Sequence, residues 1–150
     1  GQLFVGFFNM YGRGKVAAYT IARSGKTRGS ITNNEVKSVT GTLRWSDPTG
    51  ETSMDKQIQG IAIYQNKIFL SQSYGSGDSK LYVFPTSALN ALDEKNAELV
   101  ITMPPYLEQI TAYKGQLLCV FVSGSKNYAR PEIVVMDRIL SMNINALFGN

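Results

Sequence analysis

The stretch that most constrains the fold of this chain runs from Gln57 to Phe84, QIQGIAIYQNKIFLSQSYGSGDSKLYVF. β-Branched and aromatic residues recur within 57–64, Gln65-Asn66 supplies a turn signal, and 67–73 resumes the apolar pattern. Together these features predict a β-hairpin. A polar loop then leads into 80–84, an almost wholly apolar run that is typical of a strand covered on both faces. The stretch therefore predicts three consecutive antiparallel strands.

Weaker copies of this pattern occur on both sides of it. Further strands are expected at 2–8, 15–21, 38–45, 97–103, 107–113, 116–122 and 132–136. The tail at 138–147 alternates partly and is expected to form the last outer strand. The one short helix candidate is 87–92, with Thr86 or Ser87 as its N-cap.

This order of strands predicts an all-β fold made of antiparallel four-stranded blades of a β-propeller. Aligning Gln2, Lys67 and Gln116 gives spacings of 65 and 49 residues, and the shorter one lies near the period of known propeller repeats. We expect a single β domain with units at about 1–56, 57–106 and 107–150, which is too few blades for a closed ring. The alternative is a β-sandwich or barrel of about ten strands.

Composition excludes several kinds of catalytic and metal site. The 150 residues contain no histidine, which removes Ser-His-Asp and Cys-His catalysis and histidine-based metal sites from this chain. The single cysteine, Cys119, lies inside an apolar run and is expected to be a buried small hydrophobe. Asp78 and Asp137 lack a dense Asp-x-Asp loop around them, so we predict no metal and no cofactor.

Positive charge gathers in the first third of the chain. Residues 1–46 hold seven Lys and Arg against one Glu, a net charge of +6, whereas the remainder holds eight against ten, a net charge of −2. Arg13, Lys15 and Arg28 are therefore candidate anion-binding residues. The favoured alternative is a set of solvated loops, because the bases are not interleaved with aromatic residues as in single-strand binders, and nucleic acid is not expected.

Polar residues near corresponding strand starts are the candidate ligand-binding residues. Gln59 and Glu108 stand near the starts of strands that would line a propeller channel, and the side chains expected nearby are Ser71, Ser73, Tyr74 and Tyr128. Such groups suit hydrogen bonding and stacking against a sugar or a peptide. The alternative is that Gln59 and Glu108 bond backbone groups while the tyrosines pack over loops. Asp55 and Glu108 are the one carboxylate pair that could serve glycosidase-type chemistry, and no catalytic residue is assigned.

Four motifs resemble those of a group of bacterial secreted or envelope β-propeller proteins. They are Ile58-Gln-Gly-Ile61, Leu70-Ser-Gln-Ser-Tyr-Gly75, Met103-Pro-Pro-Tyr-Leu-Glu108 and the stretch from Val120 to Tyr128. The resemblance covers about 57–137 and implies a propeller fold, an extracellular or cell-envelope location and a longer whole protein. Val122 stands where the resemblance leads one to expect an acidic residue, which puts any acid-dependent site there in doubt.

These observations lead to two functional hypotheses. The first is a non-catalytic extracytoplasmic binding module that recognises a protein or a carbohydrate through loops on the rim of the propeller. The alternative is a fragment of an extracellular hydrolase or lyase whose other catalytic groups lie outside this chain. Because the chain begins at Gly1 and enters an expected strand at once, we also expect a processed or truncated chain whose ring is completed by a second chain or by further copies.

Overall fold

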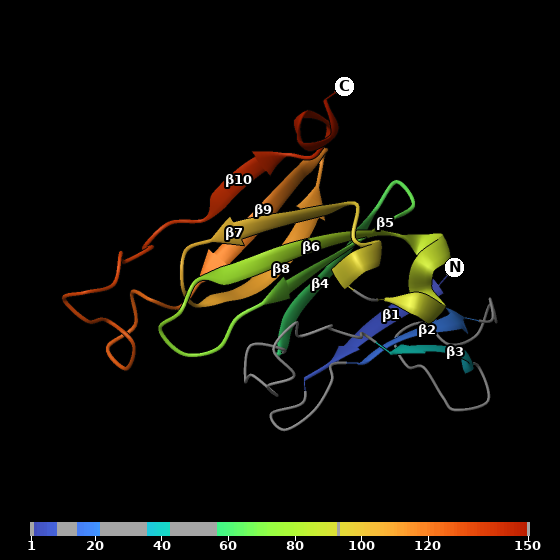
Figure 1. Cartoon of the computed structure of the whole chain (residues 1–150), viewed down its shortest axis with the longest axis horizontal. Coiled ribbons are helices and arrows are strands. Elements are labelled where there is room, and N and C mark those ends of the chain that lie inside the picture. The colour runs from blue at the N-terminus through green and yellow to red at the C-terminus, as the bar shows by residue number, and fades with distance from the viewer. Residues whose placement is uncertain (1, 9–14, 22–35, 43–56, 93, 150) are drawn as a thin grey trace, which may run out of the picture.

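The computed structural model contains antiparallel β-sheets joined by loops and short 3₁₀ helices (Figure 1). It describes residues 2–8, 15–21, 36–42, 57–92 and 94–149. The strands in this part of the chain are β1 (Gln2–Phe7), β2 (Lys15–Ile21), β3 (Val36–Thr42), β4 (Ile58–Tyr64), β5 (Lys67–Gln72), β6 (Ser79–Pro85), β7 (Leu99–Met103), β8 (Leu107–Tyr113), β9 (Gln116–Phe121) and β10 (Leu140–Asn143). The three 3₁₀ helices are η1 (Thr86–Ala91), η2 (Glu94–Asn96) and η3 (Asn145–Phe148).

The strands form one four-stranded and two three-stranded antiparallel sheets. The four-stranded sheet has the order β4-β5-β6-β7, so each strand pairs with the next along the chain. The other two have the orders β1-β2-β3 and β8-β9-β10. The predicted all-β, antiparallel character is confirmed, and so is the predicted meander from 57 to 103.

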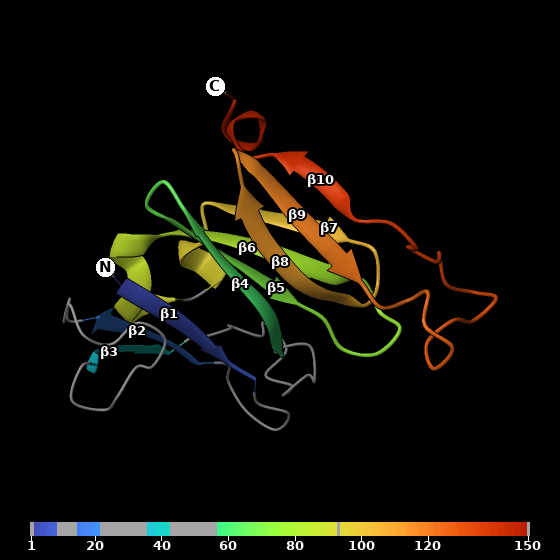
Figure 2. The same ribbon diagram turned by 180° about the vertical axis from the view of Figure 1, so that it is seen from behind.

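The four-stranded sheet, called the central sheet below, lies between the two three-stranded sheets. The β8-β9-β10 sheet is called the third sheet. Its first strand, β4, packs against both β1 and β8, and β8 also packs against β5. Figure 2 shows β1, β4 and β8 in succession, so the first strand of each sheet faces the first strand of its neighbour. This arrangement gives the four-stranded sheet an apolar environment on both faces, as the unbroken apolar run in β6 predicted.

Two apolar clusters fill the spaces on the two faces of the four-stranded sheet. One contains Ile68, Leu70, Tyr82 and Phe84 together with Val16 of β2. The other joins Phe69, Leu81 and Val83 to buried residues of the third sheet, which are Leu107, Ile110, Leu117 and Cys119. Successive residues of β5 and β6 therefore face opposite clusters, in agreement with the period of two in a strand.

Two hairpins use the same kind of turn. Gln65 and Asn66 have φ of 45° and 61°, and Lys114 and Gly115 have φ of 48° and 76°. Two consecutive residues with positive φ form the type I′ turn, whose twist matches the right-handed twist of the paired strands. These turns join β4 to β5 and β8 to β9, and they confirm the two hairpins predicted from the sequence.

One sequence prediction about the C-terminal part is wrong, whereas the expected outer strand in the tail is present as β10. Residues 132–136 form no strand, and Val134 and Val135 are exposed in the long connection between β9 and β10. Instead β10, from the tail, pairs directly with β9 as the third strand of its sheet. The apolar run at 132–136 had β propensity but gained no neighbour to pair with, and propensity depends strongly on such context.

The short helix is present but differs from its prediction in type and cap. It is the 3₁₀ helix η1, and its N-cap is Pro85, without a side-chain hydrogen bond, in place of Thr86 or Ser87. The backbone N–H of Thr86 donates to the carbonyl of Asn66 at 2.8 Å. The first residue of the helix is therefore held by the neighbouring hairpin turn, which makes a side-chain cap unnecessary.

Candidate functional site

A hollow of about 400 Å³ opens at the end of the sheets where β4 and β8 begin and where β5 and β9 end. Five of the six predicted ligand-binding residues line it, namely Gln59, Ser73, Tyr74, Glu108 and Tyr128. The other lining residues are Phe8, Gly75, Tyr106, Val122, Asn127 and Arg130. The structure thus brings together side chains that lie up to 122 residues apart in the sequence.

Gln59 and Glu108 both occupy β-bulges at the starts of their strands. In β4 the pairing jumps from Ile58 to Gly60, and in β8 it jumps from Leu107 to Gln109, so the residue between is left out of the ladder. A bulge changes the direction of a side chain and is frequent beside functional sites. The two bulges therefore direct an amide and a carboxylate from neighbouring strands into one hollow.

Backbone and hydroxyl hydrogen bonds hold this end of the sheets in place. The N–H of Ser73 donates to the carbonyl of Gln57 at 3.2 Å, and the N–H of Val122 donates to the carbonyl of Tyr106 at 3.0 Å. The N–H of Leu107 donates to the buried Oγ of Ser79 at 3.0 Å. Because Leu107 directly precedes Glu108, this last bond fixes the start of β8 against the central sheet and with it the position of the carboxylate.

The side chains of Gln59 and Glu108 are bound differently. Gln59 Nε2 donates to the carbonyl of Ser73 at 3.2 Å, so the backbone-bonding alternative holds for this residue. Glu108 forms no side-chain hydrogen bond or ion pair with any described residue, and neither does Arg130 on the same hollow. An exposed carboxylate and an exposed guanidinium are thus both available to a ligand.

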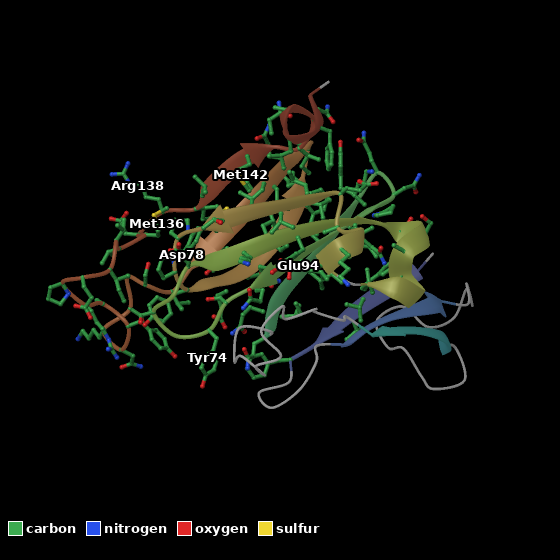
Figure 3. All side chains as sticks on the ribbon, in the orientation of Figure 1. Tyr74, Asp78, Glu94, Met136, Arg138 and Met142 are labelled. Carbon is green, nitrogen blue, oxygen red and sulfur yellow. The ribbon has the colours of Figure 1, made fainter. Side chains whose placement is uncertain are left out.

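Aromatic rings form another part of the lining. Tyr106 and Tyr128 lie with ring centroids 5.0 Å apart and planes tilted by 37°. Tyr106 is 7% exposed while Tyr128 is 43% exposed, so the first ring supports the second and leaves its other face open. Tyr74 projects from the loop between β5 and β6 (Figure 3).

Tyr106 adopts a backbone conformation that is unusual for an aromatic residue. Its φ is 64°, in the left-handed region where a side chain costs about 1–2 kcal/mol. The preceding Pro104-Pro105 and the hydrogen bond from Val122 N–H to its carbonyl hold it there. Strain of this kind concentrates at ligand-binding sites, where the surrounding structure enforces it.

Ser71 does not line the hollow, contrary to its grouping with the candidate ligand-binding residues. It is fully buried in β5, and its Oγ has no hydrogen-bond partner among the described residues. Gly60 of β4 lies beside it, because a Cβ built on Gly60 would be 2.8 Å from that Oγ and 2.8 Å from the backbone nitrogen of Ile110. Ser71 therefore belongs to the contact between β4, β5 and β8.

The remaining charged candidates do not form a described site. Arg13, Arg28 and Asp55 lie outside the described residues, as does the side chain of Lys15 at the start of β2. Arg138 Nε lies 3.6 Å from a carboxylate oxygen of Asp137. In the described part of the chain, no group of three or more His, Cys, Asp or Glu is placed to hold a metal ion.

Cys119 is buried in the apolar cluster between the central sheet and the third sheet, as predicted. Burial raises the pKa of its thiol from 9.0 to about 11. The unfolded chain should therefore release the thiol proton near pH 9 while the folded chain retains it. The contribution of this thiol to stability is complete below pH 9 and is lost as the pH rises toward 11.

We expect the native protein to resist alkylation by iodoacetamide at pH 8.5 and the urea-unfolded protein to react quickly. Between pH 9 and 11 the free energy of unfolding should fall by about 2 kcal/mol more in the native sequence than in Cys119→Ala. Urea titrations of both proteins across this range measure the difference. Equal slopes for the two proteins would contradict the burial of a neutral thiol.

Sequence reasoning missed Phe8, Tyr106, Asn127 and Arg130 as lining residues. Phe8, Ser73 and Val122 each follow directly after the last residue of β1, β5 and β9. Aligning the ends of these strands would have found Phe8. Nothing in the sequence indicates the positive φ of Tyr106 or the path of the long loop that carries Asn127 and Arg130.

The described part of the chain contains no helix long and apolar enough to cross a membrane. Comparison with models of known protein families gave no match, and comparison with curated proteins gave none either.

Proposed function

We propose that this chain is an extracytoplasmic β-propeller segment that binds a protein or carbohydrate ligand without catalysis, through the hollow at the ends of β4 and β8. The observation that carries the proposal is the convergence of Gln59, Ser73, Tyr74, Glu108 and Tyr128 on that hollow. These side chains come from four separate stretches of the chain, and their polar and aromatic groups point to a shared ligand.

Correspondences between the second and third sheets support the propeller arrangement. The turns at 65–66 and 114–115, the bulges at 59 and 108 and the backbone bonds made by Ser73 and Val122 all lie 49 residues apart. The first strands of neighbouring sheets pack together, as they do around the axis of a propeller. The extracytoplasmic location rests on the motif resemblance alone.

The chemistry of the described lining suits binding. Glu108 is the one carboxylate among the lining residues that the structure describes, and Asp55 lies outside them; glycosidic hydrolysis normally needs two acids on either side of the bond. An amide, a carboxylate, a guanidinium and an open tyrosine ring suit a ligand with several hydroxyl or amide groups and a flat apolar face. Sugars and extended peptides both have these groups.

Two substitutions in the hollow are expected to weaken ligand binding by about tenfold each. Tyr128→Ala removes the open stacking ring, and Glu108→Gln removes the charge while keeping the shape. The measurement is calorimetric titration with the best ligand from a panel of oligosaccharides and peptides. Tyr113→Ala is the matched control, because Tyr113 is an exposed tyrosine at the opposite end of β8 and should leave affinity unchanged.

Affinity that survives both substitutions would show that the ligand binds elsewhere. Turnover of a panel member that Glu108→Gln abolishes would instead favour the hydrolase or lyase alternative.

A further inference from the structure

The hollow at the ends of β4 and β8 is lined by an acid and a base that are not paired. Glu108 and Arg130 form no ion pair with each other or with any other described residue. By contrast, three other carboxylates lie beside a cation of the same chain, in the pairs Lys67–Glu98, Lys80–Glu94 and Arg138–Asp137. The described lining therefore offers one negative and one positive charge to a ligand.

The open tyrosine ring on the hollow also has no cation over it among the described residues. Two other aromatic rings are each covered by a lysine, in the pairs Lys114–Tyr113 and Lys67–Phe148, with Nζ 5.1 and 5.2 Å from the ring centre. Tyr128 is 43% exposed, and no described Lys or Arg lies over its ring. An open ring attracts an ammonium or guanidinium group through its quadrupole. The hollow is thus suited to a cation that the ligand brings.

The groups that line the hollow come from loops at one end of the sheets. Tyr74 lies in the connection between β5 and β6, and Tyr128 and Arg130 lie in the connection between β9 and β10. Figures 1 and 2 show both connections at the same end of the sheets from opposite sides. Glu108 lies in the bulge at the start of β8. The acid, the base and the rings therefore face one space of about 400 Å³, which is the size of a small ligand site.

An uncharged ligand would match this lining poorly. Covering Glu108 and Arg130 takes water from both charges, and without new partners that loss opposes binding. A ligand with a cation for Glu108 and a carboxylate for Arg130 replaces the water with charge-assisted hydrogen bonds, and a guanidinium can bind a carboxylate through two of them.

Peptides supply this combination of groups more readily than sugars do. Side chains of both signs are ordinary in a peptide, whereas common sugar units are neutral or carry a single sign of charge. Asn127 also lines the hollow, and its amide can donate to a peptide carbonyl and accept from a peptide N–H. The lining therefore favours a peptide over a carbohydrate.

We propose that the hollow binds an extended peptide that carries one basic and one acidic side chain. Glu108 and the open ring of Tyr128 take the basic group, and Arg130 takes the acidic group. This inference rests on the binding function proposed above and selects a peptide as the ligand. Glu108 and Arg130 are exposed, so salt should weaken both contacts.

Calorimetric titration with short capped peptides tests the proposal. Each peptide carries one lysine and one aspartate, at varied spacing and in both orders. For the member that binds most tightly, replacing its lysine by glutamine should weaken binding by about tenfold, and so should replacing its aspartate by asparagine. Added salt should reduce both differences.

Variants of the chain identify which charge binds which group. In Glu108→Gln the lysine replacement should lose its effect, and in Arg130→Gln the aspartate replacement should lose its effect, because one partner of each pair is already gone. Both side chains are exposed, so the variants should fold as the unmodified chain does. Glu132→Gln and Lys126→Gln are the matched controls, because they remove exposed charges outside the hollow from the loop that carries Arg130. Both controls should keep the two preferences.

Two results separate this inference from the function on which it rests. If an uncharged oligosaccharide or a fully neutralised peptide bound as tightly as the charged peptide, and Tyr128→Ala weakened that binding, the hollow would be a ligand site but not one for charged peptides. If no peptide or oligosaccharide bound with an affinity that depends on Tyr128, the proposed binding function would be wrong as well. A lysine preference that persists in Glu108→Gln would overturn the assignment of that carboxylate.

Discussion

Replacing Gly60 by alanine is expected to lower the free energy of unfolding by about 3 kcal/mol, at the upper end of the usual cost of overpacking. A Cβ on Gly60 would lie 2.8 Å from the backbone nitrogen of Ile110, 2.8 Å from Ser71 Oγ and 2.9 Å from Gln109 Oε1. Gln109 can rotate its side chain away, but Ile110 N belongs to the backbone of β8. Relief would therefore require β4 and β8 to separate, and their contact joins two sheets.

Urea denaturation followed by circular dichroism measures this effect. The matched control is Gly77→Ala in the loop between β5 and β6, because a Cβ built on Gly77 meets nothing within 4 Å. This control should change stability by less than about 0.5 kcal/mol. If Gly60→Ala proved as stable as Gly77→Ala, the close approach of β4 to β8 would be wrong.

The close approach of β4 to β8 also affects the hollow. Gly60 and Gln109 directly follow the two bulged residues, Gln59 and Glu108. If the strands separate, the amide and the carboxylate move apart. Gly60→Ala should therefore weaken ligand binding even at temperatures where the variant remains folded.

The hairpins were predictable because local signals determine them. The turn at 65–66 is short and polar and lies between two runs that contain isoleucine, and the turn at 114–115 contains a glycine. The prediction of a strand at 132–136 was wrong because the apolar pattern does not show whether another strand is available to pair with it. β9 pairs on one side with β8 and on the other with β10, whose register joins Leu140 to Cys119. Both edges of β9 are therefore occupied.

The candidate site was partly predictable for a similar reason. Gln59 and Glu108 were chosen by their place at corresponding strand starts, and the structure brings both to the hollow. Ser71 and Ser73 share one face of the strand pattern, but only Ser73 lies past the end of β5, where the hollow begins. Such a difference in depth depends on where the strand ends, which the sequence indicates only to within a few residues.

Shortening Phe69 to alanine is the second change with a large expected effect, a loss of about 3–5 kcal/mol of the free energy of unfolding. Phe69 is fully buried in β5 and belongs to the cluster that joins the central and third sheets. Leu118→Ala is the matched control, because Leu118 occupies the corresponding place in β9 but is half-buried. This control should cost less than about 1 kcal/mol, because a half-buried side chain leaves a smaller cavity when it is shortened. Equal losses in the two urea titrations would contradict the difference in burial between Phe69 and Leu118.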